Sequence, residues 1–126
     1  MNFKTFSDLL FSALSARDYN EFLKFAKEEE SFSEEMMTTG VLFRIWLYSV
    51  DRSSTKIREF TGMTRAQFCR SYRLPERTVT NWDAKKTFPP NWTLDLLCFA
   101  VLTDLHSIPT GRREDNEEDM EEETLD

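Results

Sequence analysis

Residues 64–82, T-R-A-Q-F-C-R-S-Y-R-L-P-E-R-T-V-T-N-W, predict two short helices joined by a tight turn. Thr64 is a favourable N-cap, and Gln67 three residues later can bond back to the Thr64 N–H, so a helix is expected to begin here. Leu74 and Pro75 interrupt this helix. Because proline presets the backbone angle of a first helical turn, a second helix can begin at once.

The first predicted helix has one apolar face. Phe68, Cys69 and Tyr72 fall on that face, because residues three and four apart are neighbours on a helix. Arg65 and Arg70 are left for solvent or for a ligand.

The second predicted helix, residues 76–85, turns Val79 and Trp82 inward. Its opposite face carries side chains that donate and accept hydrogen bonds, namely Glu76, Arg77, Thr80 and Asn81. A pair of short helices of which the second carries such a face is the arrangement that reads bases in a major groove. An ordinary solvated helix face is the alternative interpretation.

Three sequence runs carry a family resemblance: F-C-R-S-Y, L-P-E-R-T-V-T-N-W and F-P-P-N-W. With the small residue Cys69, the branched Val79 and the following Trp82, the stretch 55–105 resembles the helix-turn-helix family of the lambda-repressor and Cro type, also called XRE-like. Arg73 stands at the turn position where this family favours a left-handed glycine, and Glu76 is an acid at the start of the reading helix. The resemblance implies a transcriptional regulator that binds double-stranded DNA and pairs on two-fold sites.

The resemblance and the predicted geometry together assign the contacts. Base contacts are expected from Arg77, Thr80 and Asn81, with Glu76 beside them. Phosphate contacts are expected from the basic side chains that flank the reading helix, namely Arg65, Arg70, Arg73, Lys85 and Lys86, with Lys56 and Arg58 nearby. Taken singly, each of these cations is an ordinary surface charge.

The net charge of −7 over 126 residues is distributed unevenly. Residues 51–90 contain nine basic and four acidic side chains, a balance of +5, whereas residues 111–126 contain two basic and nine acidic ones, a balance of −7. Positive charge is therefore concentrated around the predicted reading helix. The acidic tail has too little apolar content to fold. It is either a solvated segment or a polyanion that covers the reading face or docks on a basic protein.

Further helices follow from apolar periodicity. The predicted N-terminal faces are Phe3, Phe6, Leu10 and Leu14 on one helix, and Tyr19, Phe22, Leu23 and Ala26 on a second, capped by Asp18. A third is expected to run from a Ser33 cap to about Val50, and Val41–Val50 is apolar nearly all round. That stretch predicts a central strut or a subunit interface.

Two more helices surround the predicted pair. Ile57 and Phe60 mark a short one that Gly62 can end in a left-handed conformation. Asn91 is expected to cap a final helix, 92–106, in which Leu94, Leu97, Ala100 and Val101 close the core and Leu96, Phe99 and Leu102 form a second packing surface. Trp82 and Trp92 are expected in the core.

Several classes of function are not supported by the sequence. Cys69 and Cys98 lie among apolar residues and are expected to be reduced core residues, not a disulfide or metal ligands. His106 is the only histidine, and neither a phosphate-binding loop nor a nucleophile elbow is present, so no enzyme, cofactor or metal site is predicted. No apolar run reaches the length of a membrane span, and a cytoplasmic protein is expected.

We therefore expect an all-α protein with an N-terminal helical segment, 1–51, a helix-turn-helix domain, 52–108, and a disordered acidic tail, 109–126. Sequence-specific DNA binding in transcriptional control is the predicted function, with a homodimer as the expected form. The alternative is a protein-interaction module of the inhibitor or antitoxin kind. In that case the N-terminal helices or the acidic tail would bind a basic, nucleic-acid-handling protein.

Overall fold

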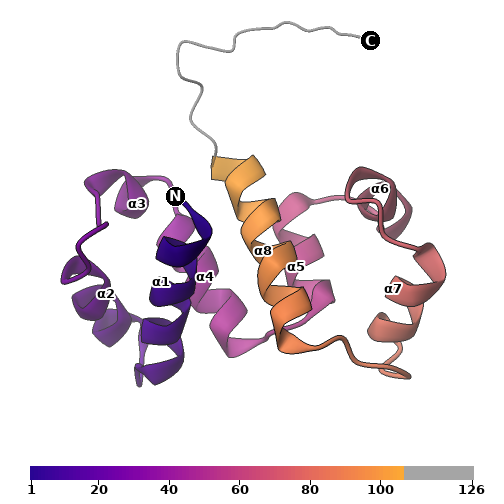
Figure 1. Cartoon of the computed structure of the whole chain (residues 1–126), viewed down its shortest axis with the longest axis horizontal. Helices are drawn as coiled ribbons and strands as arrows, with labels where there is room; N and C mark the ends of the chain where they lie inside the picture. The colour runs from indigo at the N-terminus through magenta and orange to yellow at the C-terminus, as the bar shows by residue number, and fades with distance from the viewer. Residues whose placement is uncertain (107–126) are drawn as a thin grey trace, which may run out of the picture.

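A computed structural model describes residues 1–106, which form eight helices and no strand within that range. The helices are α1 (Phe3–Ser15), α2 (Tyr19–Lys27), α3 (Glu34–Thr38), α4 (Val41–Val50), α5 (Ser54–Thr61), α6 (Arg65–Ser71), α7 (Glu76–Asp83) and α8 (Asn91–His106) (Figure 1). The all-α prediction is confirmed for this part of the chain. The predicted acidic tail lies outside the described residues. None of the described helices has the length and apolar content needed to cross a membrane.

Local capping signals were predicted correctly at three helix ends. The Asp18 carboxylate accepts a hydrogen bond from the Glu21 N–H at 2.8 Å and begins α2. Thr64 and Gln67 form a reciprocal capping box at the start of α6. Gly62 ends α5 with a φ of 71°, a left-handed conformation that glycine adopts without a steric penalty.

The predicted single helix from Ser33 to Val50 was wrong, because the chain breaks at Gly40. Gly40 has a φ of 86° and separates α3 from α4. A side chain there would be strained, and its Cβ would also lie 3.1 Å from Nη1 of Arg44. Apolar periodicity does not report this break, since the same residues fit one helix or two.

The predicted cap at Asn91 was also wrong by one residue. Asn91 is itself the first residue of α8. The Leu94 N–H donates to the Pro90 carbonyl at 3.3 Å, so Pro90 occupies the position before the helix.

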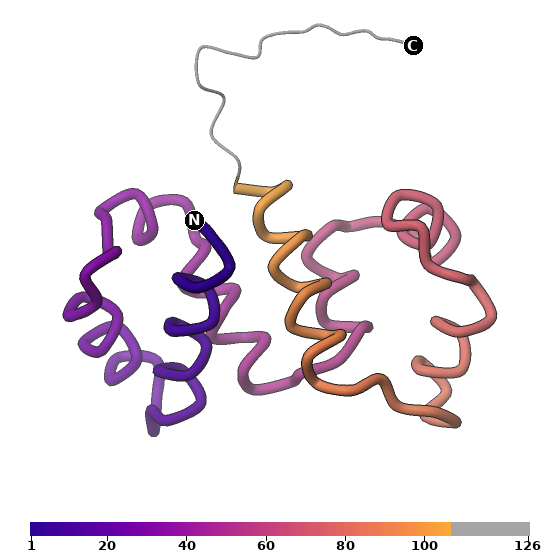
Figure 2. The backbone as a smooth tube through the Cα atoms, viewed as in Figure 1, coloured from indigo at the N-terminus to yellow at the C-terminus, as the bar shows by residue number. Residues whose placement is uncertain are grey.

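Helix α8 lies between the two groups of helices, α1–α4 on one side and α5–α7 on the other (Figures 1 and 2). It contacts α1, α4 and α5. The ring of Phe99 meets Phe3 edge-on, with centroids 5.4 Å apart, and lies 5.8 Å from Phe6. The predicted second packing surface of α8 therefore exists, but Phe99 and the fully buried Leu102 are covered by the chain's own helices. Leu96 remains exposed.

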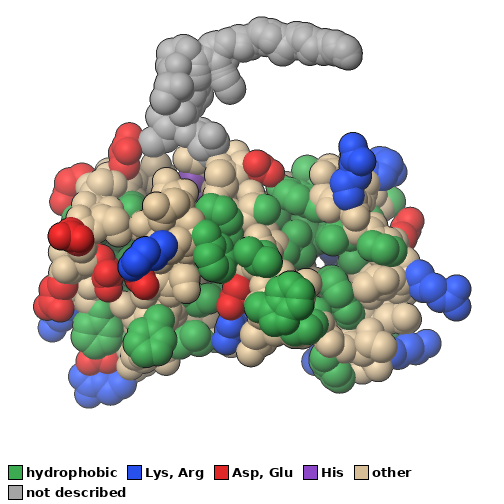
Figure 3. All heavy atoms as spheres, in the orientation of Figure 1, with side chains coloured by type: hydrophobic (Ala, Val, Ile, Leu, Met, Phe, Trp, Pro, Cys, Tyr) green, Lys and Arg blue, Asp and Glu red, His purple; other side chains and the backbone are tan. Residues whose placement is uncertain are grey.

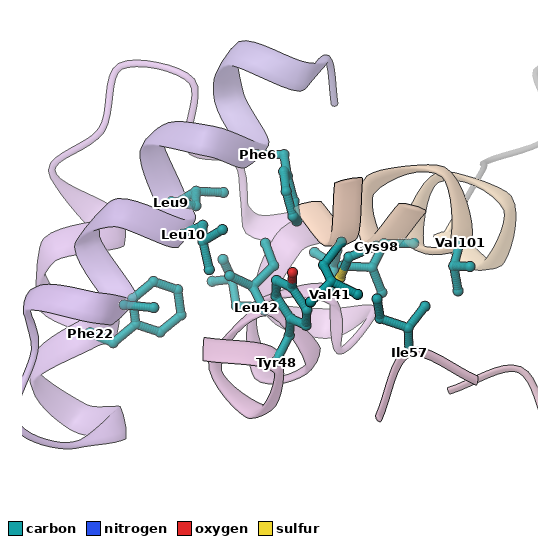
Figure 4. Packing of buried hydrophobic residues seen from close by; sticks show 14 of the residues in the cluster. Phe6, Leu9, Leu10, Phe22, Val41, Leu42, Tyr48, Ile57, Cys98 and Val101 are labelled. Atoms are coloured by element: carbon teal, nitrogen blue, oxygen red, sulfur yellow. The ribbon is translucent and has the colours of Figure 1, made fainter. Parts of the chain in front are cut away.

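One continuous core joins the two groups of helices (Figure 4). It includes Phe6 from α1, Phe22 from α2, Tyr48 from α4, Ile57 from α5 and Cys98 from α8, all without solvent exposure. Helix α4 contacts α1, α2, α3, α5 and α8, as expected of a central strut. The core thus extends across residues 51–52, where the boundary between the two predicted segments was placed.

A partly buried polar cluster reinforces the junction between α4 and α8. The Tyr48 hydroxyl donates to Oδ1 of Asp95 at 2.7 Å, and Nη2 of Arg52 donates to both oxygens of the same carboxylate at 2.8 and 2.9 Å. Burial, together with the Asp95 carboxylate, raises the pKa of Tyr48 well above its usual value. Tyr48 therefore remains a neutral hydrogen-bond donor.

Some predicted core positions are exposed. The buried stripe of α1 is Phe6, Leu9, Leu10 and Ala13, whereas Phe3 and Leu14 lie at its exposed edge. Trp92 was predicted in the core but is 67% exposed. It lies one turn before the exposed Leu96, on the outward side of α8, whereas Leu94 and Cys98 are buried on the opposite side.

Candidate nucleic-acid interface

The connection between α6 and α7 is short and contains a left-handed residue. Arg73 has a φ of 57°, and the N–H of Leu74 donates to the Cys69 carbonyl at 2.9 Å. This 6→1 bond is the signature of a Schellman motif, in which the left-handed position usually holds glycine. Pro75 follows, and α7 begins at Glu76.

The C-terminal end of α7 repeats this geometry. Lys85 has a φ of 60°, and the Lys86 N–H donates to the Asn81 carbonyl at 2.9 Å. Arg73 and Lys85 are the non-glycine residues with positive φ in the described part of the chain. Both are basic, and the carbonyl end of a helix attracts a cation. Helix α7 is therefore flanked by two turns that each present positive charge.

Helix α7 buries one side and exposes the other. Val79 is fully buried, and Trp82 is partly buried. The four residues predicted to contact bases lie on the more exposed side: Glu76 and Arg77 are exposed, and Thr80 and Asn81 are partly exposed. An acid in the first turn, such as Glu76, is favoured by the helix dipole.

An acidic residue that the sequence interpretation missed, Asp83, holds α7 in place. Its side chain is only 11% exposed. The carboxylate accepts hydrogen bonds from Thr55 Oγ1 at 3.1 Å, Arg58 Nη2 at 3.1 Å and Arg65 Nε at 3.0 Å, with Ser54 Oγ at 3.3 Å. Helices α5 and α6 are thus both fastened to the end of α7. The acid's position directly after Trp82, within an otherwise basic region, was the one available signal.

This cluster divides the predicted phosphate-binding cations into two sets. Arg58 and Arg65 are paired with Asp83, and Lys56 is paired with Glu59 at 3.0 Å. Within residues 51–90, the cations that are exposed and form no ion pair with another described residue are Arg70, Arg73, Arg77, Lys85 and Lys86. Lys and Arg side chains project from the α6–α7 end of the molecule, whereas Asp and Glu gather mainly at the α1–α3 end (Figure 3).

Arg65 is held against the outward side of α7. While its Nε donates to Asp83, its Nη1 donates to Thr80 Oγ1 at 3.3 Å. The Thr80 hydroxyl in turn donates to the Glu76 carbonyl at 2.8 Å. A chain of hydrogen bonds therefore leads from the buried carboxylate to the exposed face.

A groove of about 500 Å³ lies behind this end of α7. Its lining includes Trp82, Phe88, Pro89 and Leu94 together with polar side chains of the α4–α5 connection. Phe88 is 75% exposed, so the groove opens to solvent.

The described residues offer little for metal or thiol chemistry. Residues 1–106 contain no group of three His, Cys, Asp or Glu side chains placed to hold a metal ion. Cys69 and Cys98 are free and buried, and burial raises the pKa of both thiols. Their reactive thiolate forms are therefore disfavoured.

Comparison of the chain with protein-family models, curated proteins and solved structures gives no significant match.

Proposed function

We propose that the part of the chain from α5 to α8 acts as a helix-turn-helix domain that binds double-stranded DNA and regulates transcription. The observation that carries the proposal is the outward side of α7, where Arg77, Thr80 and Asn81 lie between two basic, left-handed turns. The short α6–α7 connection, with a left-handed residue where the resembled family favours glycine, also supports it.

The side chains of α7 match the chemistry of base edges. Arg77, near the start of the helix, can donate two hydrogen bonds to guanine O6 and N7. Asn81, one turn later and about 6 Å further along the axis, can pair with adenine N6 and N7. Each such bidentate contact discriminates against a wrong base by about 1–3 kcal/mol.

The flanking charges suit contacts to phosphates. Because Asp83 is neutralised internally by Arg58 and Arg65, it contributes little negative charge to the surface. Arg70, Arg73, Lys85 and Lys86 remain exposed around α7. Such cations position a protein on DNA without reading its sequence, and they make binding depend on salt.

Selection of bound sequences from random duplex DNA tests the proposal. Arg77→Ala and Asn81→Ala are expected to weaken binding to the selected site by about 1–3 kcal/mol each and to relax preference at one base pair each. Lys24→Ala, which removes an exposed cation from α2, is the matched control and should bind as the parent does. Parental affinity and preference in both α7 variants would contradict the proposal.

Pairing of two copies on a two-fold site is part of this proposal. Trp92 and Leu96 lie one turn apart on α8, and both expose apolar surface. They offer a contact for a second copy, in place of the partly buried Phe99, which packs on α1.

A second candidate, a protein-interaction module, is favoured by the opposite end of the molecule. Helix α3 and the segment between α2 and α3 carry exposed acids, including Glu28, Glu30, Glu34 and Glu35. This surface would suit a basic, nucleic-acid-handling protein. A stable complex with such a protein that persists in excess duplex DNA would support this candidate over the first.

A further inference from the structure

The Thr80 side chain lies on the outward side of α7, but its hydroxyl is already engaged. The hydroxyl proton is donated to the Glu76 carbonyl at 2.8 Å. One oxygen lone pair accepts the Arg65 Nη1–H at 3.3 Å. A threonine hydroxyl has a single proton to donate, so Thr80 has none left for guanine O6, purine N7 or thymine O4.

Arg65 is oriented by a second partner besides Thr80. Its Nε is bonded to the Asp83 carboxylate at 3.0 Å, and its side chain is 40% exposed. Asp83 is itself fastened to α5 through Thr55 and Arg58. Because Asp83 already orients the planar guanidinium, the further bond to Thr80 costs Arg65 little conformational freedom.

We propose that Thr80 selects a thymine through its γ-methyl group, which would contact the C5-methyl of the base. With its proton engaged, the hydroxyl can only accept a hydrogen bond, from adenine N6–H or cytosine N4–H, so the γ-methyl is the part of the side chain left to recognise thymine. Apolar contact with the thymine methyl is an established means of recognition in the major groove. The inference rests on the proposed function, because it needs α7 in that groove. It assigns Arg65 and Asp83 as positioning residues for Thr80.

The inference is tested with the preferred duplex obtained by selection. Each thymine is replaced in turn by deoxyuridine, which lacks only the C5-methyl. At one position the parent protein should bind the uracil duplex about four-fold more weakly, as expected for the burial of one methyl group. Thr80→Ser keeps the hydroxyl and removes the methyl, so it should bind the two duplexes equally. Thr80→Val keeps a methyl and removes the hydroxyl, so it should retain the preference.

The outcomes separate this inference from the function on which it rests. Absence of sequence-dependent duplex binding by the parent would overturn the proposed function, and this inference with it. A further outcome is that the parent selects a site while Thr80→Ser loses affinity for each uracil-substituted duplex as the parent does. That result would overturn only the role of Thr80. So would loss of the thymine preference in Thr80→Val when circular dichroism shows the parent's helix content and melting temperature.

Discussion

At the scale of single residues, Arg73 and Lys85 hold backbone conformations that cost an ordinary L-residue roughly 1–2 kcal/mol. Both residues follow the C-terminal ends of helices, α6 and α7, and their φ angles are 57° and 60°. Glycine would relieve that cost, as it does at Gly62. Under the proposed function, a basic residue at each position lowers the free energy of unfolding relative to glycine but supplies a positive charge beside α7.

Two substitutions of Arg73 separate the backbone from the charge. Arg73→Gly should raise the free energy of unfolding by about 1 kcal/mol relative to Arg73→Ala, because only glycine relieves the left-handed strain. Both variants lose the same charge, so both should reduce the log–log salt slope of DNA binding by about 0.9. Urea denaturation and a binding series in salt measure the two effects. Equal stabilities of the two variants would contradict the strain argument.

His106 gives a prediction about pH. Burial, and then the positive charge of Arg44, whose Nη1 lies 3.3 Å from the ring Nε2, lower the pKa of His106 below 6.5. The folded state therefore disfavours the protonated ring, so this contribution to stability is complete above about pH 6.5 and is lost as the pH falls below it.

The matched variant is His106→Gln, which cannot titrate. Between pH 7.5 and 5.5, the parent should lose free energy of unfolding relative to this variant. Because His106 is the only histidine, no other imidazole contributes to that difference. If the parent and His106→Gln differ in free energy of unfolding by the same amount at both pH values, the lowered pKa of His106 would be contradicted.

At the scale of helices, the predictions from sequence succeeded where four or five neighbouring residues decide the geometry. The capping box of Thr64 and Gln67 and the left-handed end at Gly62 are of this kind. The break at Gly40 was missed because α3 and α4 together satisfy a single helical period. Asp83 was missed because its partners lie 18 to 29 positions away, and one sequence does not reveal which helices meet.

Asp83 should therefore be the critical polar residue of α5–α7. Asp83→Asn removes the charge that compensates Arg58 and Arg65, so we expect the free energy of unfolding to fall by roughly 3 kcal/mol. Glu59→Gln, which removes the partner of Lys56 in a pair confined to α5, should change it by less than about 1 kcal/mol. Chemical denaturation of both variants tests the contrast, and equal effects would contradict it.

At the scale of the whole molecule, α8 belongs to both groups of helices. The sequence predicted its surplus of apolar residues but not what covers them, because periodicity shows that a face is apolar without naming its neighbour. The structure places Phe99 against α1, so the predicted second packing surface of α8 is covered within the chain at this residue.

This position of α8 predicts cooperative unfolding. Phe99→Ala should lower the free energy of unfolding by about 2–4 kcal/mol, since it leaves a cavity beside Phe3 and Phe6. Leu96→Ala, on the exposed side of α8, should cost much less. Tryptophan fluorescence and circular dichroism should follow one common transition in the parent. Two separate transitions would show that the two groups of helices are independent.

The contact between α1 and α8 also bears on how quickly the chain folds. Helical proteins usually fold fast because most of their contacts join residues close in sequence. Here Phe3 meets Phe99, so a loop of nearly the entire described chain must close before the core is complete. The entropic cost of closing a loop grows slowly with its length, so this contact lowers the stability of the native state only slightly. It slows folding, because a contact between distant residues must form. Folding should therefore be slower than in a simple helical bundle of this size, with apolar faces of both groups exposed to association until the last helix docks.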